Sequence, residues 1–180
     1  MARNTVVLIT GPSASGKTTL QKDLLNMGWS KPVNFTTREP RSNDELDEYV
    51  FIDAETFAQK AMENHFSEIT QYAGNLYGMT RFFDEDKKLA IIVDPIGKTA
   101  LEAFFTKQGR KYFTVWVDCD EDTRLKRLLE RGTSVKGIKE RMADADWMKK
   151  VNPNYDLTLD GTMNHMELAS LVALHESSKA

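Results

Sequence analysis

Continuous apolar runs separated by amphipathic segments make up most of the chain. The runs at residues 6–10, 89–93 and 112–117 predict buried strands, because strands of a parallel sheet covered on both faces are apolar throughout. A last short strand is predicted at 155–159, and helices are predicted at 17–27, 96–108, 120–131, a segment ending near 150, and about 163–177. Strands that alternate with helices predict an α/β fold, a parallel sheet with helices on both faces.

Residues 33–80 follow a different pattern. Short segments at 31–35, 49–52, 65–72 and 76–80 predict strands, and the last two flank a turn at 73–75 and form a hairpin. Asp53 is a typical N-cap for one helix over residues 54–64. We therefore expect a small lobe of short strands and one helix.

Helical spacing also predicts which side chains face the core. The expected inward residues are Phe57, Ala61 and Met62 in the helix at 54–64, Ile96, Ala100 and Phe104 in the helix at 96–108, and Leu125, Leu128 and Leu129 in the helix at 120–131. Arg124, Arg127 and Arg131 are expected on the opposite side of that last helix. Residues 81–88 are expected to form a short polar helix, and Gly132 and Gly137 to bracket a loop.

The segment from Gly11 to Thr18 fits the phosphate-loop pattern G-x-x-x-x-G-K-[ST] at every fixed position. Backbone N–H groups of such a loop, with a helix N-terminus behind them, bind phosphate oxygens. Lys17 can reach the β- and γ-phosphates, and the Thr18 hydroxyl can hold Mg²⁺. A chance match is the alternative, but the strand before the loop and the helix after it count against it. The expected ATP-binding residues are Gly11, Ser13, Ala14, Ser15, Gly16, Lys17, Thr18 and Thr19.

Length and charge narrow the class of partner. A chain of 180 residues suits one domain, and its net charge of −3 counts against a nucleic-acid polymer as the ligand. Residues 124–141 carry a net charge of +5, which leaves −8 on the rest and suits a small phosphate-bearing molecule. Cys119 is the single cysteine and is expected to be an unreactive thiol. The chain has no apolar run of membrane-spanning length and a short segment before its first strand, so we expect a soluble, cytoplasmic protein.

A second group of residues suggests an acceptor phosphate. Arg38 and Arg41 flank Pro40, and Tyr49 lies on the next predicted strand. Two guanidinium groups and a phenol are suitable donors for a phosphate, although two surface arginines would give the same pattern. Glu68 could accept from the N–H groups of a base or be an exposed strand residue.

Two further features belong with phosphate chemistry. Asp94 follows a predicted central strand, where a carboxylate associated with Mg²⁺ is expected. The arginine side of residues 124–131, with Arg141 beyond it, could supply positive charge to a phosphoryl group in transfer, or it could be a solvated helix face.

Together these motifs resemble the guanylate kinases, which phosphorylate GMP or dGMP with ATP. The resemblance covers about residues 6–160. It includes the phosphate loop, the Thr-Thr-Arg-x-Pro-Arg signature at 36–41, Tyr-x-Phe at 49–51, Gly-Asn-Leu-Tyr-Gly at 74–78, Asp-x-x-Gly at 94–97, and the arginines of a lid. It implies a P-loop kinase fold forming a single domain over 1–180. The core would be 1–32, 81–123 and 151–180, the monophosphate-binding lobe 33–80, and the lid about 124–150.

The resemblance also implies a role for each site residue. Arg38, Arg41, Tyr49 and Tyr77 would hold the acceptor phosphate, and Glu68 would read the guanine edge. Asp94 would orient acceptor and metal, and Arg127, Arg131 and Arg141 would act on the donor phosphates. The implied catalytic set is Lys17, Arg38, Asp94, Arg131 and Arg141, and the cofactors are ATP and Mg²⁺.

Three positions depart from the family pattern. Met79 stands where the family has a Ser or Thr that helps to read guanine, and Thr80 would substitute only if the strand were shifted. Asn34 stands where a serine serves the acceptor phosphate, and Asp160 and Gly161 replace Asn-Asp near the donor base. Met79 therefore leaves open a kinase of other or broader nucleoside monophosphates, and a non-catalytic protein-binding module is a further alternative. The expected assembly is a monomer or homodimer.

Overall fold

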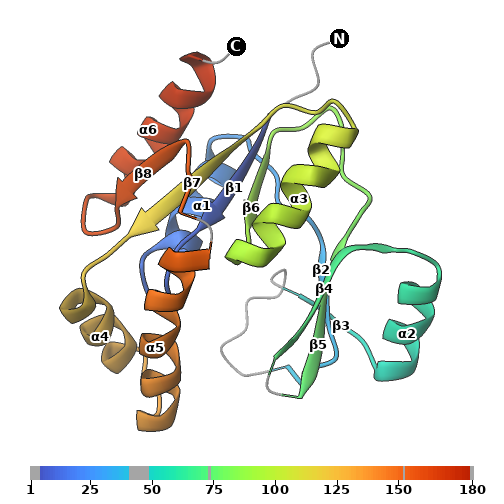
Figure 1. Ribbon diagram of the computed structural model, residues 1–180, viewed down its shortest axis with the longest axis horizontal. Coiled ribbons are helices and arrows are strands. Elements are labelled where there is room, and N and C mark those ends of the chain that lie inside the picture. Colours follow the sequence, from blue (N-terminus) through green and yellow to red (C-terminus); the bar gives the residue numbers. More distant parts are fainter. Residues whose placement is uncertain (1–4, 41–48, 73, 152, 179–180) are drawn as a thin grey trace. The chain divides into compact units, whose positions relative to one another are not determined.

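The chain folds into two compact units, one of Met1–Ser30 with Asp86–Ala180 and the other of Lys31–Glu85 (Figure 1). The computed structural model describes residues 5–40, 49–72, 74–151 and 153–178. The finer division of the first unit into a core and a lid stays a prediction.

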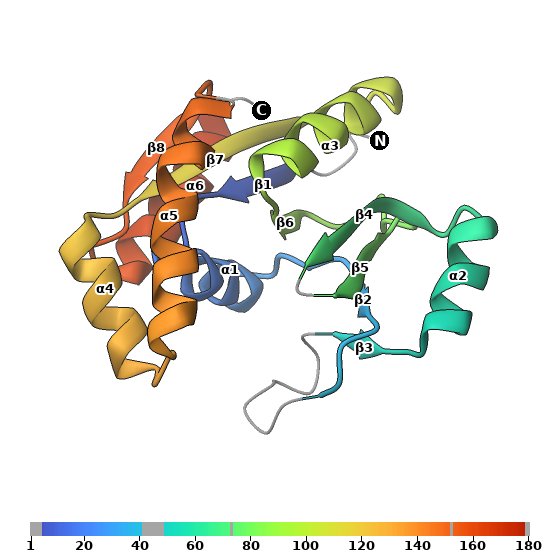
Figure 2. The same ribbon diagram turned by 60° about the horizontal axis from the view of Figure 1, so that its bottom comes forward.

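The first unit is built on a four-stranded sheet of order β6-β1-β7-β8. The strands are β1 (Val6–Thr10), β6 (Leu89–Ile92), β7 (Tyr112–Asp118) and β8 (Leu157–Asp160), and every pairing is parallel. Helices α1 (Lys17–Asn26) and α6 (His165–Ser178) cover one face of the sheet, and α3 (Pro95–Lys107) covers the other (Figures 1 and 2). The predicted parallel sheet with helices on both faces is confirmed.

Alternation along β1 divides its side chains between two buried layers. Val7 and Ile9 pack with Leu20 and Leu24 of α1 in the larger cluster, which also includes residues of α6. Val6 and Leu8 point the other way and are fully buried on the α3 side. Because both faces of β1 are covered, its carboxyl end is the fixed point from which the phosphate loop begins.

The remaining two helices of this unit follow β7. Helix α4 (Glu121–Glu130) is capped by the Asp120 carboxylate, which accepts from the Thr123 N–H at 2.7 Å. Helix α5 (Val135–Val151) contacts both α4 and α3. Gly137 lies inside α5, so the predicted loop between the two glycines is wrong and only three residues separate Arg131 from the helix.

The second unit is a small mixed sheet with one helix. The strands are β2 (Asn34–Thr36), β3 (Val50–Phe51), β4 (Phe66–Tyr72) and β5 (Asn75–Thr80), in the order β3-β2-β5-β4. Helix α2 (Ala54–Met62) begins at Asp53, whose carboxylate accepts from the Thr56 N–H. Phe35, Phe57 and Phe66 form the core, and the rings of Phe57 and Phe66 stack at 4.6 Å. The predicted strands and helix of this segment are confirmed.

Two helices present different faces to the core from those predicted. In α2, Met62 is 88% exposed, because it is about 140° around the helix from the buried Phe57. In α3 the buried side chains are Lys98, Leu101 and Phe105, and Ile96 is 61% exposed. Lys98 can face inward because its ammonium donates to Glu102 at 3.2 Å and to the Asn154 carbonyl at 3.1 Å.

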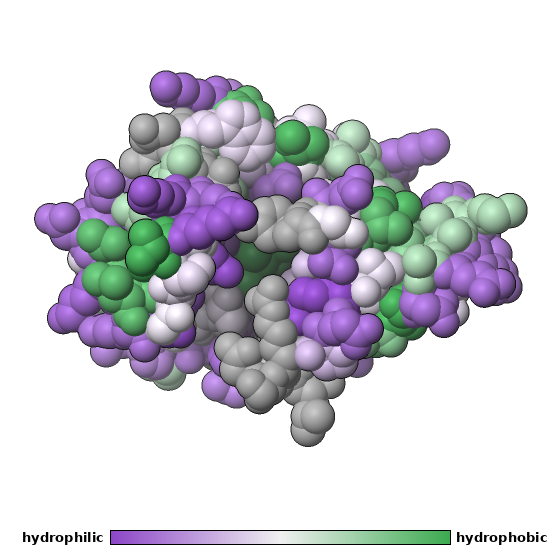
Figure 3. Space-filling model, turned by 90° about the horizontal axis from the view of Figure 1, so that it is seen from below, coloured by the Kyte–Doolittle hydropathy of each residue, from purple (hydrophilic) through white to green (hydrophobic). Residues whose placement is uncertain are grey.

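Helix α4 is oriented only partly as predicted. Leu128 is buried as expected, whereas Leu125 is 36% and Leu129 59% exposed. Apolar side chains are accordingly visible on the surface over the α4–α5 pair (Figure 3). Of the predicted outward arginines, Arg124 is buried, Arg127 is half-buried and Arg131 is exposed, so the buried side of α4 includes part of the arginine side.

Residues 81–88 form turns and bends, so the predicted polar helix is wrong. The Arg81 N–H donates to the His65 carbonyl at 2.9 Å, and the Phe82 N–H donates to the Thr80 hydroxyl at 3.2 Å. The first bond continues the pairing of β5 with the chain before β4, and the second is a local turn. Together they keep the start of the segment from forming a helix.

Candidate active site

The phosphate loop joins β1 to α1 in a conformation that needs small residues. Gly11 has φ of 155° and Gly16 has φ of 111°, and Ala14 between them has φ of 64°. A Cβ on Gly11 would collide with the Val117 carbonyl of the neighbouring strand. Within this loop the Lys17 ammonium donates to the Pro12 carbonyl at 2.6 Å. The loop is therefore closed on itself by the lysine that the motif assigns to phosphate.

Arg127 braces this loop from α4. One guanidinium nitrogen donates to the Ala14 carbonyl at 3.0 Å, and the other donates to the Gly161 carbonyl at 2.9 Å. Gly161, just after β8, donates its own N–H to the Asp118 carbonyl at 2.6 Å. Arg127 thus ties the loop to the end of β8, in addition to the role at the donor phosphates that the resemblance implies.

Gly161 is packed too closely for any larger residue. A Cβ there would overlap the Ser15 carbonyl oxygen and lie 2.8 Å from the Asp118 carbonyl oxygen, and both obstacles are backbone. We expect Gly161→Ala to lower the free energy of unfolding by about 1–3 kcal/mol and to weaken ATP binding, because the loop must shift. Urea denaturation and nucleotide titration measure the two effects. Gly137→Ala, whose Cβ would meet only side-chain atoms, is the control; equal losses in both variants would contradict this account.

Cations gather at the loop. The Arg141 guanidinium of α5 donates to the Ser13 hydroxyl at 3.2 Å. Burial is the largest cause that lowers the pKa of Lys17, and together with the positive charges of Arg124, Arg131 and Arg141 it brings that pKa to about 8. The site therefore has an excess of positive charge, which a polyphosphate would relieve.

The lowered pKa of Lys17 gives ATP binding a pH dependence. Below pH 8 the Lys17 amine is already protonated and carries the charge that binds phosphate. Above pH 8 it is mostly neutral, so ATP binding must be coupled to its protonation. We expect the Kd of Mg·ATP to rise about tenfold between pH 7 and pH 9. Calorimetric titration at the two values tests this, and Lys17→Arg, which stays charged, should lose the dependence. An unchanged Kd in the wild type would contradict it.

Asp94 lies at the carboxyl end of β6, as the sequence predicted for a carboxylate near the phosphate loop. Its Oδ1 accepts from the N–H groups of Ile96 and Gly97, both at 2.8 Å, and so caps α3. Pro95 occupies the first turn, where a missing N–H costs nothing. The capping bonds fix the orientation of the carboxylate.

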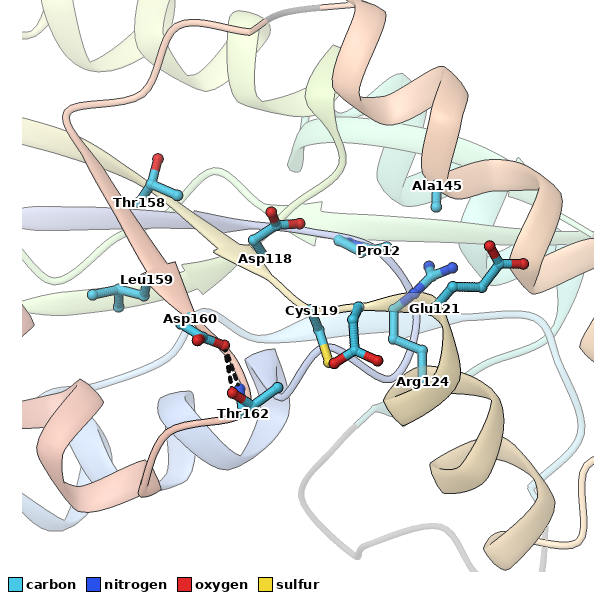
Figure 4. Close-up of a pocket in the computed structure, with 11 residues that line it drawn as sticks. Pro12, Asp118, Cys119, Glu121, Arg124, Ala145, Thr158, Leu159, Asp160 and Thr162 are labelled. Atoms are coloured by element: carbon cyan, nitrogen blue, oxygen red, sulfur yellow. Dashed lines mark hydrogen bonds between the residues drawn. The ribbon is translucent and has the colours of Figure 1, made fainter.

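A cavity of about 640 Å³ opens at the carboxyl ends of β7 and β8 (Figure 4). Its lining residues are Pro12, Asp118, Cys119, Asp120, Glu121, Arg124, Ala145, Thr158, Leu159, Asp160 and Thr162. Burial raises the pKa of the Cys119 thiol, which agrees with an unreactive cysteine. Arg124 is the one residue of this lining with a cationic side chain, and the sequence stripe of arginines was the signal that could have placed it here.

The second unit carries the predicted acceptor residues. The hydroxyls of Thr36 and Thr37 bond to the backbone of Leu76, which pins the end of β2 to β5. The Arg38 N–H donates to the Thr36 hydroxyl at 3.1 Å. The two threonines of the signature therefore hold the backbone from which Arg38 extends.

Arg38 lies among aromatic rings. Its guanidinium carbon is 5.8 Å from the centre of the Tyr49 ring and 5.3 Å from that of Phe51. The Tyr49 and Tyr77 rings meet edge to face at 5.9 Å. The structure thus brings Arg38, Tyr49 and Tyr77 together, whereas Arg41 lies outside the described residues.

Strand register places three predicted substrate-binding residues on one face of the small sheet. Met79 of β5 is paired with Asn34 on one side and with Glu68 on the other. Directly paired residues point to the same face of a sheet, so these three side chains are neighbours. Thr80 points to the opposite face, is buried, and accepts from the Phe82 N–H. Thr80 therefore does not substitute for the missing hydroxyl at Met79.

Histidine, cysteine and acidic side chains form no group of three that could hold a metal ion in the described part of the chain. No helix in the described ranges has both the length and the apolar character that a membrane crossing requires.

A phosphate loop flanked by arginines, in a unit with a parallel α/β sheet, and a second unit with an arginine–tyrosine cluster define a P-loop nucleotide kinase. The chain belongs to the guanylate kinase family, since the family model described as Guanylate kinase matches residues 2–171.

Individual relatives agree with this assignment. The chain is 31% identical over 140 residues to a guanylate kinase of Clostridium tetani, covering 74% of this chain and 66% of that protein. It is 35% identical over 150 residues to a guanylate kinase of Oleidesulfovibrio alaskensis, covering 78% and 71% respectively. The crystal structure of guanylate kinase from Anaplasma phagocytophilum superimposes with a TM-score of 0.65 at 17% identity, covering 99% of this chain and 87% of that one, and supports the fold.

Proposed function

We propose that the protein transfers the terminal phosphoryl group of ATP to GMP or dGMP. The observation that carries this proposal is the single face of the small sheet on which Glu68 lies beside Met79 and Asn34, in a unit that also holds Arg38, Tyr49 and Tyr77. A carboxylate accepts from the adjacent N1–H and N2–H of guanine, and the arginine and phenols donate to a monophosphate. The complete phosphate loop of the other unit supplies the donor site.

The protein's part in this chemistry is positioning and charge neutralisation. Lys17, Arg131 and Arg141 would balance the charge on the donor phosphates, and Arg38 would hold the acceptor phosphate. Asp94, fixed by its cap on α3, would orient the acceptor. The raised pKa of Cys119 agrees with direct transfer to the acceptor, without a protein nucleophile. Residues 124–150 would act as a lid that excludes water.

Mg²⁺ would bind together with the nucleotide. The Thr18 hydroxyl is exposed at the start of α1, beside Lys17, and the Asp94 carboxylate lies at the end of β6. Such oxygen ligands suit Mg²⁺, which keeps several waters and takes its other ligands from phosphate. When bound, the ion would neutralise developing charge on the phosphate oxygens.

Turnover of a panel of acceptors tests the proposal. ADP release is coupled to NADH oxidation with Mg·ATP and GMP, dGMP, AMP, CMP, UMP or dTMP. We expect the highest kcat/KM with GMP or dGMP. A higher value for AMP or a pyrimidine nucleotide would favour the broader kinase, and no turnover with any acceptor would favour a protein-binding module. The free nucleotides of such a reaction also suggest a cytoplasmic enzyme.

Met79 is expected to limit discrimination for guanine. A thioether does not donate the hydrogen bond that a hydroxyl gives to the base. We therefore expect Met79→Thr to raise the ratio of kcat/KM for GMP over AMP by about 3- to 10-fold, the value of one neutral hydrogen bond. Met62→Thr, at the exposed methionine of the same unit, is the control. An unchanged ratio in Met79→Thr would remove this position from base recognition.

A further inference from the structure

Arg124 is a buried cation with an unmet hydrogen-bonding need. Its side chain is 3% exposed on the inner face of α4. One guanidinium nitrogen, Nη2, donates to the weak acceptor Met142 Sδ at 3.5 Å, and the other, Nη1, is buried with no hydrogen-bond partner among the described residues. A buried donor without an acceptor destabilises a protein by about 1–3 kcal/mol, and more when it is charged. An apolar residue beside Leu128 would fill the same position without that cost.

Arg127, one turn along the same helix, differs from Arg124 because both of its terminal nitrogens have hydrogen-bond acceptors. Its two terminal nitrogens donate to the carbonyls of Ala14 and Gly161. Four carboxylates line the cavity, and none of them accepts from Nη1 of Arg124. Two are already engaged, because Asp120 caps α4 and Asp160 accepts from the N–H and hydroxyl of Thr162. The described residues therefore provide no acceptor for the unpaired nitrogen of Arg124.

The position of the guanidinium indicates which acceptor it lacks. It extends from α4 towards Pro12 and Ala145, at the opposite end of the cavity from Asp160 and Thr162 (Figure 4). Pro12 is the loop residue whose carbonyl accepts from the Lys17 ammonium at 2.6 Å. Among the three arginines that lower the pKa of Lys17, Arg124 has the largest effect. Arg124 and Lys17 thus approach the same loop segment with two cationic groups.

We propose that Arg124 is a ligand of the terminal phosphate of the donor nucleotide, which supplies the acceptor that its buried guanidinium nitrogen lacks. The inference rests on the proposed function, since it concerns the donor site of that reaction. A charged guanidinium–phosphate bond in a buried site is strong, because both partners are desolvated and the geometry is fixed by the planar donor. Arg124 would therefore be a catalytic residue beyond the set that the motifs indicate.

The test compares nucleotides with and without the terminal phosphate. The Kd values of ADP and of the non-hydrolysable β,γ-imido analogue of ATP are measured by calorimetry with Mg²⁺ for wild type, Arg124→Met and Arg124→Lys. Arg124→Met should bind the analogue about 10- to 100-fold more weakly, and ADP nearly as well as wild type does. Arg124→Lys, which keeps the charge, should recover part of the loss. Thermal unfolding without nucleotide should show Arg124→Met to be at least as stable as wild type.

A matched control separates this role from a structural one. Arg110 is also 3% exposed, and its Nη2 donates to the Lys87 carbonyl at 2.7 Å, but it lies just before the start of β7, at the other end of that strand from the cavity. Arg110→Met should leave the ratio of the two Kd values unchanged. Equal weakening of both nucleotides by Arg124→Met, or no weakening of either, would overturn the inference. Binding is measured apart from turnover, so failure of the wild type to phosphorylate GMP would overturn the proposed function alone.

Discussion

Replacing Lys17 by Ala is expected to lower kcat for phosphoryl transfer by about 10²- to 10³-fold, the usual cost of losing one group that stabilises charge in a transition state. Phosphoryl transfer leaves little covalent chemistry to the protein, so its rate depends on cations placed around the transferring group. The Lys17 ammonium already lies inside the phosphate loop, held by the Pro12 carbonyl at 2.6 Å. Little reorganisation is then needed for it to exchange that carbonyl for a phosphate oxygen. A coupled assay with Mg·ATP and GMP measures the effect.

A control lysine variant and the affinity for ATP distinguish a role of Lys17 in transfer from a general effect of removing a lysine. Lys107→Ala, at an exposed lysine in the last turn of α3, should retain wild-type turnover. Arg131 and Arg141 remain in the Lys17→Ala variant, so the affinity for ATP should fall less than kcat does. Turnover of Lys17→Ala at the wild-type rate would exclude Lys17 from the mechanism.

The elements that sequence predicted correctly are those fixed by local chemistry. Predominantly apolar runs identified β1, β6 and β7, because a strand covered on both faces carries few polar side chains. Thr114 inside β7 is buried because its hydroxyl donates to the Asp156 carboxylate at 2.9 Å. Asp53 indicated the start of α2, since a carboxylate at an N-cap accepts from N–H groups that have no partner within the helix. The apolar runs and the N-cap depend on neighbours only a few residues away.

Helix faces were harder to predict, because charged side chains also occupy interiors when partners are present. Lys98 turns inward onto Glu102 and the Asn154 carbonyl, which moves the buried side of α3 away from Ile96. Arg127 turns inward because two main-chain carbonyls accept from it. Both partners of Arg127 and one of Lys98 are backbone groups distant in sequence, so no spacing rule reveals them.

The candidate site also combines residues that local motifs predicted with residues whose placement depends on distant parts of the chain. The phosphate loop and the threonine–arginine signature were readable as motifs, but the choice between Met79 and Thr80 required the register of β5 against its two neighbours. A shift of one residue exchanges the two faces of a strand, and the sequence alone does not fix the register. Pairing with Asn34 and Glu68 places Met79 on the face of the predicted base-reading residues.

Glu68→Gln is expected to lower kcat/KM for GMP by about 10²- to 10³-fold. The carboxylate of Glu68 would accept from two N–H groups of guanine, whereas a glutamine can direct its own N–H₂ at one of them. The variant therefore loses a charge-assisted bond and leaves a buried donor unsatisfied. The loss should fall on GMP and dGMP and spare AMP, whose N1 accepts a hydrogen bond. Steady-state kinetics with GMP and AMP measure both sides of this change.

The specificity of that loss distinguishes base reading from a general effect on the small unit. Glu55→Gln, at an exposed position in the first turn of α2, should have no effect on either substrate. Glu68 pairs across the sheet with Met79 and lies two residues from Phe66 of the core, so a purely structural role would lower the rates for GMP and AMP together. Equal losses for the two nucleotides would therefore assign Glu68 to the fold, and a loss confined to GMP assigns it to the guanine edge.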